Sequence, residues 1–282
     1  MLKQRVLTAL LLLPAALAGI FMLPVGGFAI AVAAVFVLAA REWGAFVMAD
    51  SKMAKISYGA AMAVLLAALL LLVPSDLIWA NGHLHPLYHG LLVVGVLWWV
   101  IGLGLVLSFP GSSRFWQDSP FLKSLFGQLT LLPCFAALLV LKAMPGAIDG
   151  AWLVLAVLLL VWGADTGAYF VGKAIGRNKL IPTVSPGKTR EGLLGGMAVC
   201  ALLSLIGWQL IDSLSLFEAL ILGMVTAFAS ALGDLLESMF KRAANIKDSG
   251  SLLPGHGGVL DRIDSVTAAM PVFAFLYLIF GL

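Results

Sequence analysis

Long, continuous apolar runs separated by short polar segments dominate the sequence. Each run approaches the roughly 20 residues that a helix needs to cross the hydrocarbon core of a bilayer. The strands of a membrane β-barrel would instead show short segments of alternating hydrophobicity. The pattern therefore predicts an all-α polytopic membrane bundle of about nine transmembrane helices, because only helices and closed barrels satisfy their backbone polar groups in lipid. The apolar runs cover residues 6–23, 25–40, 57–74, 90–109, 125–143, 151–172, 191–211, 216–240 and 264–281.

The composition agrees with this pattern and excludes an ordinary soluble domain. Hydrophobic residues make up 62% of the 282 residues, whereas soluble proteins are nearer half apolar. The formal net charge of +3 is small, and no basic patch interleaved with exposed aromatic residues indicates a nucleic-acid partner. The lipid bilayer is thus the first partner that the sequence predicts.

The distribution of Lys and Arg predicts the orientation in the membrane. If the N-terminus is cytoplasmic, all 17 Lys and Arg residues except Lys142 fall on the cytoplasmic side, as the positive-inside rule requires. This orientation places the polar loops 173–190 and 241–262 on the cytoplasmic side. We expect about five helices in residues 1–150, and the remaining helices together with these two polar loops in residues 151–282 of the same bundle.

One polar stretch, residues 238–264, interrupts this apolar chain with the sequence SMFKRAANIKDSGSLLPGHGGVLDRID. Its carboxylates suit a hard divalent cation such as magnesium, and its Lys and Arg side chains can neutralise phosphate. Its glycines let backbone N–H groups approach an anion. The simpler interpretation is a solvated loop whose positive charge only fixes topology. The combination of HGG with DRID favours a phosphate and metal site.

Two predicted helices carry a stripe of polar residues along one face. The stripe in the sixth run includes Asp165, and the stripe in the eighth run includes Asp234, each with polar neighbours at three- or four-residue spacing. An Asp near the middle of a transmembrane helix costs about 2.5–3.5 kcal/mol on insertion scales. We therefore expect both side chains to line one cavity. The alternative is internal pairing, such as Glu237 or Asp234 with Lys241.

The loop after the sixth run, residues 172–192, reads GKAIGRNKLIPTVSPGKTREG. It is not a Walker A loop, because that pattern requires a glycine where this chain has Pro182. Its side chains Lys179, Lys188 and Arg190 can still contact phosphates. Glycines spaced four residues apart flank the loop, and such pairs could bring two helices close together.

The polar stretch resembles the signature of phosphatidate cytidylyltransferases, also called CDP-diacylglycerol synthases. The matching positions are Ser238, Phe240, Lys241, Arg242, Lys247, Asp248, Pro254, His256, Gly257, Gly258, Val259, Asp261, Arg262, Ile263 and Asp264. The resemblance implies transfer of a cytidylyl group from CTP to phosphatidic acid, with CDP-diacylglycerol and pyrophosphate as products. It implies Mg2+ as the cofactor, allows a second cation, and suggests a homodimer. We expect a bacterial cytoplasmic (inner) membrane, with the active site on the cytoplasmic side.

The resemblance also implies roles for the acidic residues. Asp234 and Asp261 match positions that would bind the catalytic magnesium, near the cytoplasmic ends of their helices. Asp165, Asp248 and Asp264 would each supply a further ligand or support one, and Asp165 is also a candidate for substrate binding.

Basic and polar residues would hold the substrates. The residues expected to contact phosphates of nucleotide or lipid are Lys241, Arg242, Lys247 and Arg262, and of these Lys241 and Arg262 are expected to act in catalysis. Ser185 and Lys188 would belong to the CTP site, because a similar SPGKT-like segment is associated with the nucleotide in this family. His256 would either donate a hydrogen bond to phosphate or only order the glycine turn.

Two other functions fit parts of the pattern. A CTP-dependent lipid kinase would use similar groups on an alcohol substrate. A secondary transporter would also show acidic residues and glycine-interrupted helices within the membrane, but this chain contains no second copy of the signature.

Histidine and cysteine residues add little chemistry. The spacing of His83, His85 and His89 is compatible with a zinc site, but no cysteine or group of carboxylates accompanies them. We interpret this segment as an interfacial loop, and its role stays open. Cys134 and Cys200 both lie in apolar runs, which does not favour a structural disulfide.

Overall fold

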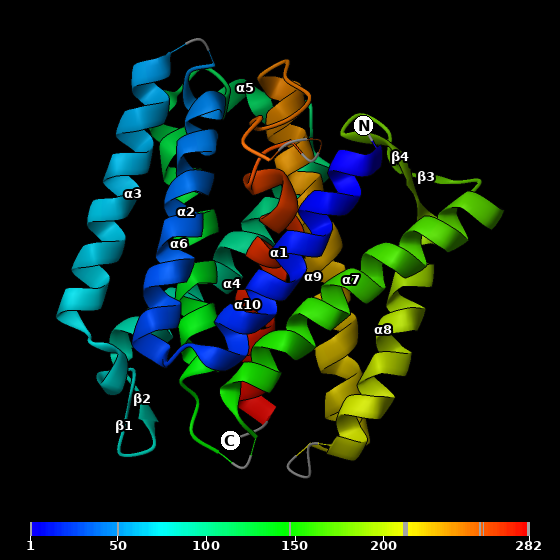
Figure 1. Cartoon of the computed structure of the whole chain (residues 1–282). Helices are drawn as coiled ribbons and strands as arrows, with labels where there is room; N and C mark the ends of the chain where they lie inside the picture. The colour runs from blue at the N-terminus through cyan, green and yellow to red at the C-terminus, as the bar shows by residue number, and fades with distance from the viewer. Residues whose placement is uncertain are drawn as a thin grey trace.

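The computed structural model describes residues 2–49, 51–146, 148–210, 214–253, 255 and 257–280, and most of them are helical (Figure 1). The long helices are α1 (Leu2–Met22), α2 (Val25–Val47), α3 (Lys52–Leu72), α4 (Pro86–Leu107), α6 (Pro120–Lys142), α7 (Gly150–Ile175), α8 (Arg190–Leu210), α9 (Leu216–Ala243) and α10 (Leu260–Phe280). The short elements are η1 (Ser75–Leu77), β1 (Trp79–Ala80), β2 (His83–Leu84), α5 (Ser113–Trp116), β3 (Lys179–Ile181) and β4 (Ser185–Thr189). The strands form two antiparallel hairpins, β1 with β2 and β3 with β4.

Eight helices in the described part of the chain are long and apolar enough to cross a membrane, namely α2, α3, α4, α6, α7, α8, α9 and α10. In α1 the described apolar portion, Leu10–Met22, is shorter. The all-α multi-pass bundle predicted from the sequence is thus confirmed. Helices from both halves of the chain contribute to one hydrophobic core, and the division near residue 150 stays a prediction.

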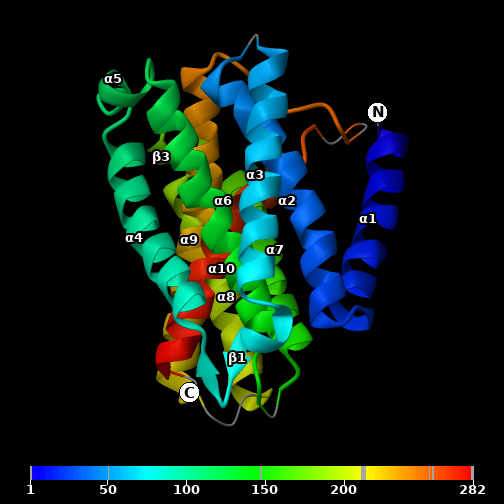
Figure 2. The ribbon, with the colours of Figure 1, turned by 90° about the vertical axis from the view of Figure 1, so that its left-hand side faces the viewer.

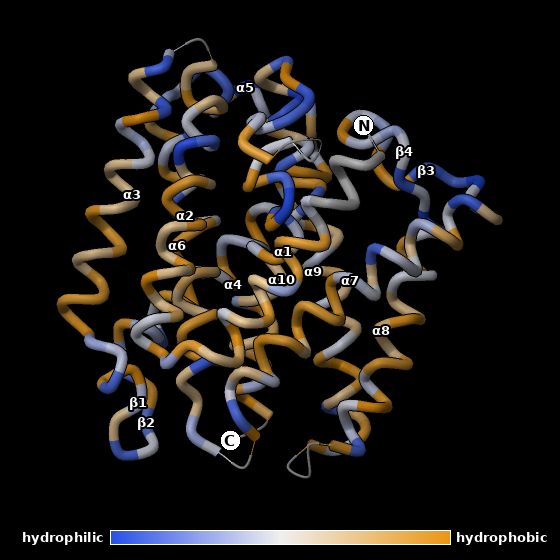
Figure 3. Tube along the Cα trace, in the orientation of Figure 1, coloured by the Kyte–Doolittle hydropathy of each residue, from blue (hydrophilic) through white to orange (hydrophobic). Residues whose placement is uncertain are grey.

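The polar connections gather at the ends of the bundle. The chain between α9 and α10, the α2–α3 turn, α5, the β3–β4 hairpin and the N-terminus lie toward one end, which we call the signature end (Figures 1 and 2). The β1–β2 hairpin and the C-terminus lie at the opposite end. Hydrophobic residues follow the helix bodies between these ends (Figure 3). This layered distribution is the one that a lipid bilayer requires.

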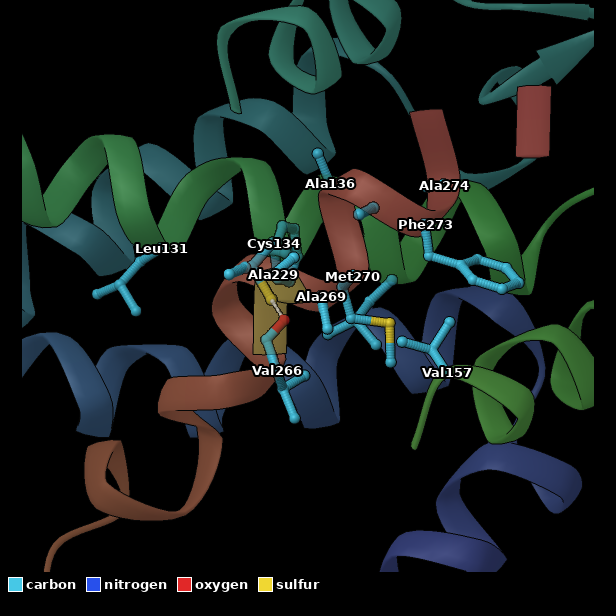
Figure 4. Close-up of a cluster of buried hydrophobic side chains, with 14 of the residues drawn as sticks. Leu131, Cys134, Ala136, Val157, Ala229, Val266, Ala269, Met270, Phe273 and Ala274 are labelled. Carbon is cyan, nitrogen blue, oxygen red and sulfur yellow. Dashed lines mark hydrogen bonds between the residues drawn. The ribbon is translucent and has the colours of Figure 1, made fainter. Parts of the chain in front are cut away.

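The centre of the bundle is built from α6, α9 and α10, and it contains many small side chains. Ala136 of α6, Ala229 of α9 and Ala269 of α10 are buried in one cluster (Figure 4). The Cys134 thiol of α6 donates a 3.5 Å hydrogen bond to the Val266 carbonyl of α10. Cys134 and Cys200 are both free and buried. Small residues let membrane helices approach closely, so that van der Waals packing holds them together.

Helices α7 and α8 approach each other through glycine. A Cβ atom on Gly196 of α8 would lie 2.6 Å from the Ala164 carbonyl oxygen of α7, and one on Gly192 would lie 2.9 Å from the Ala168 carbonyl oxygen. A Cβ on Gly172 would lie 3.5 Å from the Gly192 Cα. The prediction that these spaced glycines bring two helices together is therefore confirmed.

Several helix boundaries differ from those that the apolar runs predict. Helix α2 continues past residue 40 to Val47, and α10 begins at Leu260 rather than at residue 264. Asp261 consequently lies in the first helical turn, where a carboxylate is favoured by the helix dipole. The hairpins were not predicted, because strands of two to five residues are too short to show a period in the sequence.

The α7–α8 contact can be tested with two alanine substitutions on the same helix. Gly196→Ala should lower the free energy of unfolding by about 1–3 kcal/mol, because the new methyl group overpacks against backbone that cannot rotate away. Gly207→Ala is the matched control, since a Cβ at Gly207 meets no atom within 4 Å. Reversible unfolding in mixed detergent micelles measures both. Equal stability of the two variants would contradict the close contact.

Candidate active site

A pocket of about 490 Å3 opens between α7, α8, α9 and β4. Glycine, alanine and other apolar residues of the helices form much of its wall. Its polar and charged lining residues are Asp165, Tyr169, Lys173, Lys188, Thr189 and Asp234. The expectation that Asp165 and Asp234 line one cavity is therefore confirmed. The pocket combines an apolar wall with charged groups, which suits a ligand that has both characters.

Lys188 and Asp234 form the main ion pair of this pocket. The Lys188 Nζ atom lies 2.8 Å from Asp234 Oδ2, and it also donates a 3.4 Å hydrogen bond to the Ala231 carbonyl. The Ser238 hydroxyl donates to Asp234 Oδ1 at 3.1 Å. Asp234 is thus paired with a lysine from the β3–β4 hairpin. It is not paired with Lys241, the partner in the alternative interpretation of the sequence.

The β3–β4 hairpin is held in place by both neighbouring helices. The Thr189 side chain accepts a hydrogen bond from the Gly192 N–H at the start of α8. The Glu191 carboxylate accepts hydrogen bonds from the backbone N–H groups of Arg177 and Asn178. Arg242 of α9 donates its Nε–H to the Val184 carbonyl at 3.2 Å. These contacts fix the strand that presents Lys188 to the pocket.

A second charged cluster surrounds Asp261 at the start of α10. The Lys241 ammonium lies 2.8 Å from Asp261 Oδ1 and 2.5 Å from Glu237 Oε2. The backbone N–H of Ser249 donates to both Asp261 oxygens at 3.1 Å, and the N–H of Gly258 donates to Oδ2 at 2.8 Å. The predicted Glu237–Lys241 pair therefore exists, and Lys241 additionally connects α9 to α10.

The contacts around Asp261 require a glycine at position 257, in the turn before α10. Gly257 adopts a φ of +84°, which disfavours residues with a side chain. A Cβ atom on Gly257 would also lie 2.9 Å from Asp261 Oδ2. His256 and Pro254 lie outside the described residues, so the role of His256 stays a prediction.

The two charged clusters flank a close contact between α9 and α10. Gly233 of α9 packs directly against the backbone carbonyl of Asp264 on α10. Asp234 is the next residue on α9. The fold thus brings Asp234, Asp261 and Asp264 onto adjoining turns of two packed helices, although Asp234 and Asp261 contact different lysines.

The other predicted site residues are less closely engaged. Arg242 on the last turn of α9, Lys247 and Asp248 in the chain between α9 and α10, and Arg262 on the first turn of α10 are exposed. Ser185 begins β4 and pairs with Ile181 across the hairpin, without lining the pocket. The structure brings Asp165, Lys188 and Asp234 together, and separately Lys241 and Asp261.

Glu42 is a polar residue of this region that the sequence did not single out. It lies on α2, just beyond the apolar run 25–40 that the sequence predicts. Its side chain is buried against the chain between α9 and α10. The only sequence signal was a carboxylate beside an aromatic residue at the edge of an apolar run.

The chemistry of the acidic residues suits a magnesium ion that substrate helps to coordinate. The described residues contain no group of three or more His, Cys, Asp or Glu side chains that could hold a metal alone. Mg2+ often takes only one or two carboxylates, together with water and substrate phosphates. Asp234 and Asp261 supply carboxylates of this kind, although a cation would compete with Lys188 and Lys241 for their oxygens.

Three histidines lie at the end of the bundle opposite the signature end. His83, His85 and His89 form no metal-binding group among the described side chains. His85 instead precedes α4 and accepts a 3.2 Å hydrogen bond from the Leu87 N–H. This contact is a helix cap.

Comparison with known proteins identifies the family. Residues 3–280 match the cytidylyltransferase family. The chain is 46% identical over 278 residues to the phosphatidate cytidylyltransferase of Pseudomonas aeruginosa, covering 98% of this chain and 97% of that protein. It is 41% identical over 285 residues to the phosphatidate cytidylyltransferase of Haemophilus influenzae, covering 98% and 99%. A Bacillus subtilis enzyme of the same name is 46% identical over 126 residues, which are 44% of this chain and 46% of that protein. With a match along nearly its whole length, the chain belongs to the cytidylyltransferase family.

Proposed function

We infer that this chain is a nucleotidyltransferase that moves a cytidylyl group from CTP to phosphatidic acid, giving CDP-diacylglycerol and pyrophosphate. The observation that carries this conclusion is the match of residues 3–280 to the cytidylyltransferase family. Phosphatidate cytidylyltransferases that are 41% and 46% identical over 98% of the chain support it. A pocket with charged groups beside an apolar helix wall is also the shape that a phospholipid substrate needs.

The reaction requires charge neutralisation more than proton transfer. An oxygen of the phosphatidate phosphate attacks the α-phosphorus of CTP, and the bond to the bridging oxygen of pyrophosphate breaks. The attacking phosphate is already ionised, so no strong general base is needed. The obstacle is the approach of two anions and the charge that develops on pyrophosphate. Lys188 in the pocket and Lys241 beside Asp261 are placed to offset these charges.

We propose that Asp234 and Asp261 hold a magnesium ion together with phosphate oxygens of the substrates. Such an ion would withdraw charge from the phosphates and orient them. The support is the donor set itself, which is two carboxylates on packed helices, of which Asp234 lines the pocket. A second cation near Asp165 or Asp264 is a further proposal. Asp264 lies where α10 packs against Gly233, the residue before Asp234.

The remaining proposals concern orientation and assembly. We propose that the site faces the cytoplasm of a bacterial inner membrane, where CTP is available. The positive-inside distribution of Lys and Arg supports this orientation, as does the gathering of the charged loops at the signature end. The homodimer that the family resemblance implies stays a prediction.

The two other functions considered from the sequence are not favoured. A CTP-dependent lipid kinase would transfer phosphate to an alcohol and leave no cytidine in its lipid product. A secondary transporter would not account for a family match over residues 3–280.

Asp261→Asn tests the assignment of the acidic site. The substitution should reduce CTP-dependent formation of CDP-diacylglycerol by at least about a hundredfold, because it removes a charge placed at the reacting groups. Radiolabelled CTP and phosphatidic acid in detergent micelles provide the measurement.

Asp149→Asn is the matched control for that variant. Asp149 also accepts a backbone N–H at a helix start, from Ala151 at 2.8 Å, but α7 begins at the opposite end of the bundle (Figure 1). Activity should persist in Asp149→Asn. Normal activity in Asp261→Asn would rule out its proposed role.

Lys188→Ala tests the nucleotide role of the pocket. Loss of one charge-assisted contact should raise the KM for CTP by about tenfold, with a smaller effect on the KM for phosphatidic acid. Lys52→Ala, which removes an exposed lysine at the start of α3, should change neither constant. Equal increases for both substrates in Lys188→Ala would argue against a specific nucleotide contact.

A further inference from the structure

A buried carboxylate on α2 contacts the chain between α9 and α10 and the first residue of α10. This residue is Glu42, which is only 8% exposed. Its Oε2 atom accepts a 2.8 Å hydrogen bond from the Leu260 N–H and a 3.4 Å hydrogen bond from the Ser249 hydroxyl. These partners are 218 and 207 residues away in the sequence. A buried carboxylate requires such donors, because burial without them is costly.

Two glycines let the backbone close around this side chain. Cβ atoms on Gly250 and Gly258 would each overlap the Glu42 carboxylate. Neither glycine has the positive φ that Gly257 shows. The requirement for glycine therefore comes from the presence of Glu42, together with the Ser249 hydroxyl at Gly258, and not from a special backbone conformation.

The segments that hold Glu42 are also the segments that hold Asp261. Ser249 donates its hydroxyl to Glu42 and its backbone N–H to Asp261. Gly258 packs against Glu42 and donates its N–H to Asp261. Leu260, whose N–H Glu42 accepts, is the residue before Asp261 and the first residue of α10. The same backbone segments therefore contact both the Glu42 carboxylate and the Asp261 carboxylate.

The position of Glu42 itself is fixed by aromatic packing. Trp43, its neighbour on α2, contacts Phe240 of α9 with ring centroids 5.0 Å apart. Phe46, one turn further along α2, stacks on the same ring at 5.8 Å. Phe240 directly precedes Lys241, the lysine that pairs with Asp261. Aromatic contacts of this kind hold α2 and α9 in one register.

One oxygen of Glu42 is not satisfied by these contacts. Its Oε1 atom is buried and has no hydrogen-bond partner among the described residues. An unsatisfied buried acceptor lowers stability, so the carboxylate is retained at a cost that its hydrogen bonds from Leu260 and Ser249 must offset. This observation points to a role in shaping the site.

We propose that Glu42 is a positioning residue that sets the orientation of the Asp261 carboxylate. By accepting the Leu260 N–H and the Ser249 hydroxyl and by packing against Gly258, it keeps the N–H groups of Ser249 and Gly258 directed at Asp261. The proposal rests on the role of Asp261 given above. Glu42 touches no substrate and acts only through the backbone that it holds.

The test compares Glu42→Ala with Glu42→Gln in the full-length protein in detergent micelles. Glu42→Ala should lower kcat by at least about tenfold, with the KM for CTP changed by less than about threefold, and should raise the Mg2+ concentration for half-maximal activity. Glu42→Gln should retain kcat within about threefold, because the amide oxygen can still accept the Leu260 N–H.

Amide hydrogen exchange provides a readout that does not depend on activity. In Glu42→Ala, residues 245–260 should exchange faster than in the unsubstituted protein, while α8 peptides should remain unchanged. Glu42→Asp guards against failure of the alanine variant to fold. It keeps the charge but is one methylene shorter, so it should lose the Leu260 contact and reproduce both effects.

Glu218→Gln serves as the matched control. Glu218 also caps a helix start, where its Oε2 accepts the Ser215 N–H at 2.8 Å, but α9 begins at the opposite end of the bundle (Figure 1). This variant should leave kcat and exchange in residues 245–260 unchanged.

The outcomes distinguish anchoring of the backbone by Glu42 from positioning of the Asp261 carboxylate. Unchanged exchange in residues 245–260 in Glu42→Ala and Glu42→Asp would overturn the anchoring. Faster exchange with unchanged kcat would overturn the positioning role. If Asp261→Asn is fully active, the role of Asp261 and the positioning proposal both fail, and the exchange data still show whether Glu42 anchors the backbone.

Discussion

Compensation of charge at the end of an apolar bundle is the interaction on which this structure depends. A carboxylate near the membrane boundary lacks the full hydration that it has in water, so it must find cations or N–H donors within the protein. Asp261 finds a lysine and two backbone N–H groups, and Asp234 finds a lysine and a serine. Because Lys188 of β4 pairs with Asp234 of α9, and Lys241 of α9 pairs with Asp261 of α10, these contacts also decide how the elements meet.

The neutralisation of the aspartates by lysines also affects how anionic substrates can bind. The lysines that neutralise the aspartates are also the groups that can receive phosphates, so a substrate anion and a protein carboxylate compete for the same ammonium groups. The two lysines come from separate elements, Lys188 from β4 and Lys241 from α9. Two anionic substrates can therefore each be met by a lysine of their own, while the adjoining aspartates remain close to both.

The sequence predicted the large features of the fold because the bilayer itself fixes them. Helix length follows from membrane thickness, and eight apolar runs correspond to helices long enough to span it. The signature motif led to the correct family because its polar residues stand at fixed spacing in an apolar chain. The polar stripes correctly placed Asp165 and Asp234 on one pocket.

Other features could not be read from the sequence, for physical reasons. Strands as short as β3 and β4 show no periodicity, so the hairpin that carries Lys188 to Asp234 was missed. The start of α10 was placed late because its first turn is polar, although Asp261 is well suited to a helix N-terminus. Glu42 was missed because nothing in one sequence connects it with a backbone N–H 218 residues away. Individual catalytic and metal-binding roles stay predictions.

The glycine contact between α7 and α8 also determines how the pocket can vary. Ala164, Ala168, Gly172, Gly192 and Gly196 all line it, and these residues have no rotamers to change. Where they face the pocket, a bulkier ligand cannot gain room by moving a side chain. Room on that side of the pocket can come only from the longer side chains of the same two helices, such as Tyr169 and Met197.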